Sequence, residues 1–148
     1  MKKTLSAAAL ALLAACSSAT GLDVRGTTAV RVQTDARSYG LINDTPVPVA
    51  FTVTNTTSDA VAVSRCGDAP AAQVERYHSG RWEVAFSGIC PAVLEQAPLM
   101  LAPGATLSGV VQIQRTTGSF RLVVPLGEPT DAKAPASSPS FTVRYLED

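Results

Sequence analysis

The sequence has few of the residues on which nucleic-acid and sugar binding usually depend. Aromatic residues make up 5% of the 148 positions, so stacking platforms for bases or sugars are scarce. Twelve basic residues balance twelve acidic ones, and the formal net charge at pH 7 is zero. Binding to a nucleic-acid backbone needs a concentrated positive surface. We therefore expect no nucleic-acid partner.

Catalytic and cofactor motifs are also absent from the sequence. General acid–base and nucleophilic catalysis need titratable groups brought together, whereas the acidic residues here are scattered, mostly over predicted turns and outward strand positions. His78, the single histidine, stands in a predicted hairpin turn beside Ser79. No phosphate-binding loop, dinucleotide fingerprint, nucleophile elbow or calcium-loop spacing occurs. We predict that the chain is not an enzyme and that it holds no cofactor.

The first 15 residues have the pattern of a secretory signal. Lys2 and Lys3 are followed by an apolar run over residues 5–14 and by two small residues before Cys16. The run is too short to span a bilayer, which needs about 20 apolar residues. We predict that residues 1–15 are a cleaved signal peptide.

The residues Leu13-Ala14-Ala15-Cys16 resemble the lipobox of bacterial lipoproteins, in which the cysteine becomes the acylated first residue of the mature chain. The resemblance implies membrane attachment in the cell envelope through acyl chains, of the palmitate type, on Cys16, each buried methylene contributing about 0.8 kcal/mol. Residues 17 and 18 are serines, without the acidic residue of an inner-membrane retention signal, so the resemblance favours an outer membrane, facing the periplasm, in a host with two membranes. Residues 16–26 then form a tether and residues 27–148 the folded domain. The alternative is an ordinary secreted protein with a cysteine at its cleavage site.

Once Cys16 is assigned to lipid, the other two cysteines are left as a pair in an oxidising compartment. We therefore predict a disulfide between Cys66 and Cys90. Closing a loop of about 25 residues contributes on the order of 3 kcal/mol, mainly by restricting the unfolded chain. The alternative is metal binding by two thiols, but His78 is the single histidine and no Cys-x-x-Cys spacing exists. We expect no metal.

Apolar and polar residues alternate with period two along most of the remaining chain, as in strands with one buried face. The predicted strands are 30–33, 49–54, 61–66, 72–77, 81–86, 107–113, 120–124 and 141–145. Turn formers at 55–59 predict a hairpin between the second and third strands, and Gly80, able to take a positive φ, predicts another at 78–80. Trp82, Val84 and Phe86 are expected on one face, with Trp82 in the core.

Seven or eight short strands without helical periodicity predict an all-β fold, an immunoglobulin-like antiparallel β-sandwich that follows the cleaved signal. An up-and-down barrel is the alternative. Residues 125–139 contain four prolines, so we predict a long loop there without a regular strand. The cysteine pair would tie a strand end to a loop, unlike the antibody disulfide.

Four motifs occur in order between residues 47 and 124: a strand ending at Asn55 with Thr and Ser after it, GRW at 80–82, LAPG at 101–104 and GSFRL at 118–122. Together they resemble small bacterial immunoglobulin-like domains, including that of the intracellular proteinase inhibitor family. The resemblance implies the fold. The predicted lipid anchor and disulfide do not fit an intracellular inhibitor.

These features lead to the expectation of a lipid-anchored, non-enzymatic module that binds or scaffolds an envelope protein, with protease inhibition outside the cytoplasm as the alternative. A disulfide-braced loop over 87–98 is the predicted partner-binding site, through Ile89, Val93 and Leu94. These side chains could instead cover the open end of the sandwich. A second candidate is an unpaired sheet edge, and a third is a cationic patch of Arg81 and Arg121, which could equally be solvated sheet residues.

Overall fold

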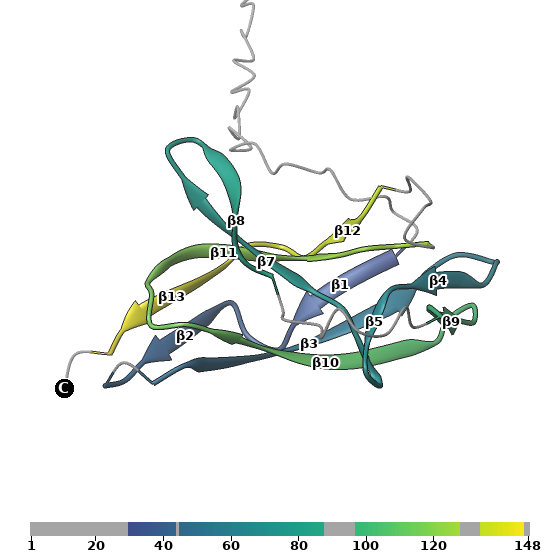
Figure 1. Cartoon of the computed structure of the whole chain (residues 1–148), viewed down its shortest axis with the longest axis horizontal. Coiled ribbons are helices and arrows are strands. Elements are labelled where there is room, and N and C mark those ends of the chain that lie inside the picture. Colours follow the sequence, from purple (N-terminus) through teal and green to yellow (C-terminus); the bar gives the residue numbers. More distant parts are fainter. Residues whose placement is uncertain (1–29, 44, 88–96, 128–133, 147–148) are drawn as a thin grey trace, which may run out of the picture.

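The computed structural model describes residues 30–43, 45–87, 97–127 and 134–146 (Figure 1). All regular elements in these residues are strands, which confirms the all-β prediction. No helix in this part of the chain is long and apolar enough to cross a membrane. The predicted signal peptide over 1–15 and tether over 16–26 lie outside the described residues.

Eight of the strands have four or more residues, which agrees in number with the seven or eight predicted; the strand over 38–41 was not predicted, and the predicted strand over 61–66 is divided into two short ones. They are β1 (Val30–Thr34), β2 (Ser38–Leu41), β3 (Val47–Asn55), β7 (Gln73–His78), β8 (Arg81–Ser87), β10 (Thr106–Ile113), β11 (Gly118–Val124) and β13 (Phe141–Tyr145). The shorter ones are β4 (Val61–Val63), β5 (Arg65–Cys66), β6 (Ala69–Pro70), β9 (Leu99–Leu101) and β12 (Ala136–Ser137).

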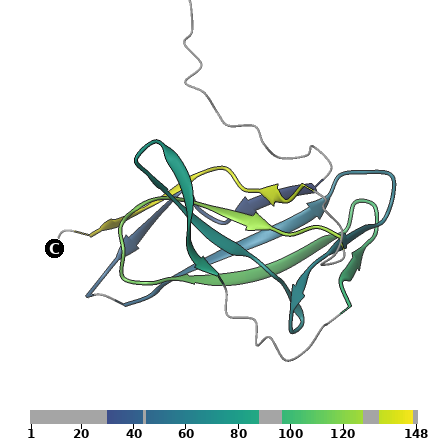
Figure 2. The same cartoon turned by 45° about the horizontal axis from the view of Figure 1, so that its top comes forward.

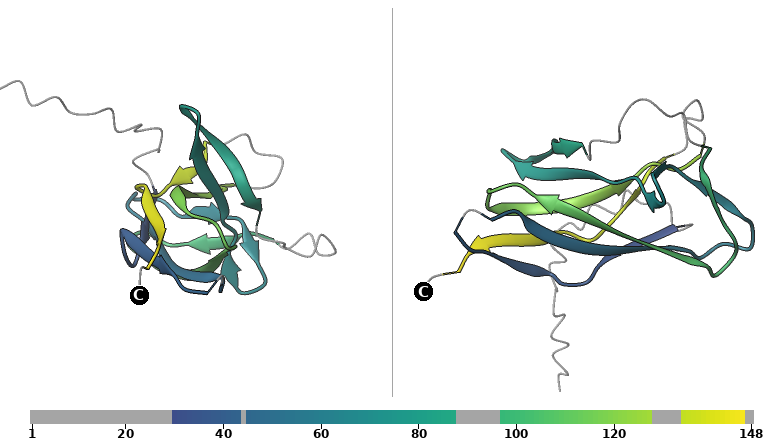
Figure 3. Two further views of the ribbon diagram at one scale, coloured as in Figure 1. Left: turned by 90° about the vertical axis from the view of Figure 1, so that its left-hand side faces the viewer. Right: turned by 60° about the horizontal axis from the view of Figure 1, so that its bottom comes forward.

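The strands form an immunoglobulin-like sandwich of two main sheets (Figures 2 and 3). One sheet has the order β1-β3-β10, and the other has the order β2-β13-β11-β7-β8 with β12 beside β11. The opening segment contributes β1 to the first sheet and β2 to the second, where β2 runs parallel to β13. The other strand pairs of the described residues are antiparallel.

The core lies between the two sheets, and the alternation of the sequence explains which side chains enter it. Along β3 the apolar positions are buried and the intervening positions are half-buried or exposed. Across from them, Phe120 packs 6.0 Å from Phe141, measured between ring centroids. Burying a side chain of this size contributes about 1.5–3 kcal/mol. The largest fully buried side chains are Phe120, Phe141, Leu41, Ile113, Leu122, Val32, Val49, Val53, Val63, Val74, Val124 and Val143.

The predicted hairpin around residues 55–59 is wrong. β3 pairs with β1 and β10, whereas β4 pairs with β9 and bridges to Leu126 through Val63. The turn itself exists, but Asn55 anchors it against residues 101–105. The backbone N–H of Asn55 donates to the Ala105 carbonyl, and the backbone N–H of Gly104 donates to the Asn55 carbonyl. The chain therefore leaves the β3 ladder at this turn and crosses the end of the sandwich.

The predicted hairpin at residues 78–80 is confirmed, with Ser79 and Gly80 both at positive φ between β7 and β8. The prediction that Trp82, Val84 and Phe86 share one face is wrong. A β-bulge shifts the register, because Val74 pairs with Phe86 while the next residue, Glu75, pairs with Val84. Since a bulge changes which side of the sheet a residue faces, Phe86 packs against the core while Val84 is 57% exposed.

The proline-rich segment also differs from its prediction as a loop without a strand. β12 pairs with Val123 and Val124 of β11, and its Ala136 is fully buried. Ser138 follows, and its hydroxyl oxygen accepts a hydrogen bond from the Leu122 amide. A strand of two residues between prolines makes too few alternations for the sequence to reveal it.

Tyr39 links the β1–β2 connection to the core. Its ring meets Phe141 edge-on at 5.4 Å, its hydroxyl donates to Asp35 Oδ1, and the Ala36 amide donates to the hydroxyl. Burial, and then the hydrogen bond to Asp35, raises the pKa of Tyr39 above its ordinary value of 10.0. The neutral phenol is therefore the form that the folded state prefers.

We expect this preference to appear as an alkaline loss of stability. The contribution is fully present below the unfolded pKa of about 10 and is lost as pH rises through the raised folded pKa. The urea midpoint, followed from about pH 8 to about pH 12, should fall less steeply in Tyr39→Phe than in the natural chain. Tyr145→Phe, at a 58% exposed position, is the control. Equal slopes in all three chains would contradict the assignment.

Candidate functional site

The outer side of the larger sheet carries a cluster of aromatic and charged side chains, which we call the hairpin face. Its members are Glu75, Tyr77, Trp82, Val84 and Arg121. Glu75 and Tyr77 alternate along β7, so they share one face. Tyr77 stands directly opposite Trp82, and Glu75 stands opposite both Val84 and Arg121.

The opposite side of the same strands faces the core. Val74, Phe120 and Leu122 lie there with at most 2% of their surface exposed. The hairpin face is thus the solvent side of a sheet that is held rigidly from behind.

Arg121 is the centre of the hairpin face. Its guanidinium carbon lies 4.6 Å from the centroid of the Trp82 ring, and its Nε donates to Glu75 Oε2 over 2.7 Å. The Arg121 and Glu75 side chains are only 16% and 18% exposed. A charge-assisted hydrogen bond and a cation–π contact together fix the guanidinium in one position.

Tyr77 completes the cluster from the neighbouring strand. Its ring centroid lies 5.3 Å from that of Trp82, with a tilt of 59° between the planes. Tyr77 is 49% exposed and Trp82 is half-buried. The prediction that Trp82 belongs to the core is therefore wrong: it packs on Arg121 and Tyr77 at the surface, because the bulge turns it outward.

The two aromatic residues sit on a hairpin that projects from the sheet (Figure 1). Pairing between β7 and β11 ends at Arg76, so Tyr77 and His78 pair only with β8. Beyond Arg76 the hairpin is therefore not flanked by β11, and both of its faces are open to solvent or to a partner. A projecting hairpin with aromatic side chains is a suitable shape for contact with another molecule.

Charge on the hairpin is balanced, so the suggested cationic patch does not form there. Arg121 faces Glu75, and Arg81 Nε lies 2.5 Å from Glu83 Oε1. The second pair is exposed, at 78% and 39% of the two side chains, and such pairs contribute little to stability. Arg121 is not a solvated sheet residue either, because its side chain is mostly covered.

The site residues predicted from the sequence have different outcomes. Cys66 ends β5 and is disulfide-bonded. Cys90, its predicted partner, lies outside the described residues, and so do the lipidation residue Cys16 and the predicted binding-loop residues Ile89, Val93 and Leu94. The Cys66–Cys90 pairing, the lipid anchor, the binding loop and the protease-inhibitor alternative stay predictions.

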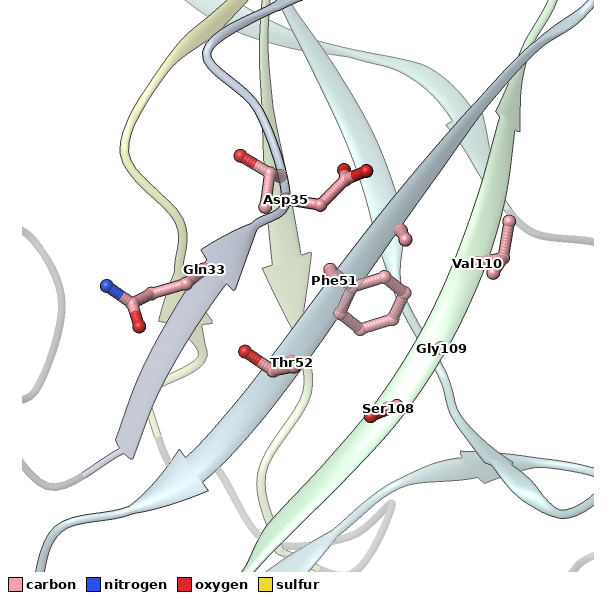
Figure 4. Close-up of a pocket in the computed structure, with 9 residues that line it drawn as sticks. Gln33, Asp35, Phe51, Thr52, Ser108, Gly109 and Val110 are labelled. Carbon is pink, nitrogen blue, oxygen red and sulfur yellow. The ribbon is translucent and has the colours of Figure 1, made fainter.

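A second surface feature is a hollow of about 470 Å³ on the smaller sheet (Figure 4). Polar side chains alternate with apolar surface in its lining, and Asp35 is the one ionisable side chain there. Gly109 is required at its rim, because a Cβ there would lie 2.6 Å from Cζ of Phe51. The lining residues are Gln33, Thr34, Asp35, Ala50, Phe51, Thr52, Ser108, Gly109 and Val110. Nowhere in the described residues do three or more His, Cys, Asp or Glu side chains gather in a way that could hold a metal ion.

No family model matches the chain, and no curated protein matches it significantly. Among solved structures, a β-glucosidase from Erythrobacter marinus matches with a TM-score of 0.36 and 16% sequence identity. The match covers 77% of this chain and 15% of that enzyme chain. At this TM-score the similarity assigns neither a family nor an activity.

One prediction needs correction. From the missing catalytic motifs we predicted that the chain is not an enzyme, and the glucosidase match stands against that exclusion, although at a TM-score of 0.36 it assigns no activity to this chain. Missing sequence motifs are a weak ground for excluding catalysis, because catalytic groups are brought together by the fold and not by spacing in the sequence. The exclusion is withdrawn.

Proposed function

We propose that this chain is an envelope lipoprotein, anchored through acylated Cys16, whose sandwich binds another envelope protein through the hairpin face. In a host with two membranes the domain would face the periplasm from the outer membrane. The observation that carries the binding proposal is the Tyr77–Trp82–Arg121 cluster. Trp, Tyr and Arg are the residues most enriched among the energetic hot spots of protein interfaces.

The arrangement of the cluster supports a binding role over a purely structural one. Tyr77 and Val84 are 49% and 57% exposed, so the cluster adds little apolar burial to the fold. Arg121 is already held by Glu75 and Trp82, and an arginine fixed in advance loses less conformational entropy on binding. The balanced charges fit a partner surface without a strong charge of either sign.

The direct test is site-specific photo-cross-linking in intact envelopes of the cells that make the protein. A photoreactive amino acid replaces Val84, and the matched control replaces Met100, which is 66% exposed on β9. We expect a discrete adduct with one protein from position 84 that is absent from position 100. The same adducts from both positions, or none from position 84, would contradict the proposal.

With the partner in hand, Trp82→Ala should weaken binding at least about 30-fold, which corresponds to a hot-spot loss of about 2 kcal/mol. Trp82→Phe keeps an aromatic face for Arg121 and should show a smaller loss. Met100→Ala serves as the control, and circular dichroism checks that each variant is folded. Titration calorimetry of the full chain measures the affinities. Unchanged affinity in Trp82→Ala would remove the hairpin face from the interface.

A further inference from the structure

β10 is an edge of the smaller sheet, and its own residues have none of the features that usually protect an edge strand. Among the described residues it pairs with β3 alone; β6 contacts it without forming a ladder. Its eight residues, TLSGVVQI, include no charge and no proline, and its register with β3 has no bulge. Edge strands are normally guarded by such features. β8, one of the two edges of the other sheet, has both a bulge and the Arg81–Glu83 pair.

The hydrogen-bond pattern shows which backbone groups of β10 reach the open edge. The Asn55 amide bonds the Ala105 carbonyl, and bonded and non-bonded pairs alternate along an antiparallel ladder. Every second residue of β10 from Leu107 onward therefore bonds to β3. The residues between them, Thr106, Ser108, Val110 and Gln112, direct their N–H and C=O groups outward. Pro48 fits this pattern. It stands opposite Gln112, which does not bond to β3, so the N–H that proline lacks is not needed for the ladder between β3 and β10.

We propose that this edge pairs with the β10 strand of a second copy of the chain, antiparallel and symmetric about Gly109. In that register Thr106 lies opposite Gln112, and Ser108 lies opposite Val110. All four outward-bonding residues then find partners, and the three-stranded sheets of the two copies become one sheet of six strands.

The composition of β10 favours a second copy as the occupant. Two-fold pairing of a strand with itself places its charged residues near their own copies, which is destabilising, and β10 has none. Val110, 61% exposed in the single chain, gains Ser108 of the second copy as its cross-strand neighbour. The hollow of Figure 4 reaches the open edge at Ser108, Gly109 and Val110, so the pairing would join the hollows of the two copies. Symmetric two-fold dimers are also the commonest oligomers.

The test is sedimentation velocity of the full chain, solubilised from membranes in a mild detergent, over a concentration series. We expect a dimer whose dissociation constant rises at least about tenfold in Val110→Lys, because the symmetric register brings the two lysines close together on the same face of the joined sheet. Ile42→Lys, at a 54% exposed position in the 42–46 connection, is the control for charge and should leave the dimer unchanged.

A second variant distinguishes loss of the dimer from misfolding of the chain. Val110→Pro removes an outward N–H without touching the ladder to β3, and proline is tolerated on edge strands. It should likewise raise the dissociation constant of the dimer, with unchanged circular dichroism. A natural chain that stays monomeric, or a dimer that survives both variants, overturns the proposal. So does a photoreactive residue at position 110 that captures a different protein in place of a second copy.

Discussion

Asn55→Ala is expected to lower the free energy of unfolding by about 3 kcal/mol. Asn55 is fully buried at the end of β3, and both the nitrogen and the oxygen of its side-chain amide make hydrogen bonds. Nδ2 donates to the Asp59 and Leu101 carbonyls, at 2.7 and 2.9 Å, and Oδ1 accepts from the amide and hydroxyl of Thr57. Alanine would leave the Leu101 carbonyl and the Thr57 amide without these partners, and each buried unsatisfied group costs about 1–3 kcal/mol.

The urea midpoint, at unchanged m-value, measures this loss. Asn55→Asp is the sharper variant, because it keeps the shape and the acceptor oxygen but replaces the donor that faces two carbonyls. It should be at least as destabilising at neutral pH. Ser58→Ala is the matched control in the same turn, since Ser58 is exposed and its hydroxyl makes a single 3.4 Å contact with Asp59. A change below about 0.5 kcal/mol in both Asn55 variants would contradict the role assigned to this amide.

The strands that could be predicted from the sequence are those with one buried and one open face. In β3 the alternation runs through the strand, because Val49, Phe51 and Val53 face the core while the residues between them face outward. β11 shows where the rule weakens. Val123 and Val124 are both buried, although successive residues of a strand face opposite sides of the sheet. Burial on both faces of a strand removes the alternation of apolar and polar residues from which strands are predicted.

The partner of a strand was harder to predict than its existence. The turn at Asn55 has the composition of a hairpin, and only its contacts with residues 101–105, nearly 50 positions later, send the chain to the other side of the sandwich. The β8 bulge is similar. Neither glycine nor proline stands at the register shift between Val74 and Glu75, so the sequence does not predict the bulge. The bulge nevertheless decides that Trp82 faces solvent and Phe86 faces the core.

The candidate site could be found only in part. Gly80 predicts a tight turn, and a two-residue loop at 79–80 places Tyr77 opposite Trp82, so the aromatic pair was within reach of the sequence. The sequence points to Arg121 only as a possible member of a cationic patch. Its pairing with Glu75 depends on β11 lying beside β7, a contact between residues 46 positions apart. No local pattern contains that information.

Cys16→Ala is expected to abolish lipid labelling of the chain entirely, the largest effect of any single change. The predicted lipobox makes the Cys16 sulfur the attachment point for acyl chains, and alanine offers no group to acylate. Cells fed a clickable fatty-acid analogue should yield a labelled natural chain whose mature N-terminus, by mass spectrometry, is the modified Cys16. Ser17→Asp, which keeps the cysteine, is the control and should label normally while shifting toward the inner membrane in a host with two membranes. A natural chain that is cleaved at this position but carries no label would instead establish the ordinary secreted protein. The hairpin face would then act free of the membrane.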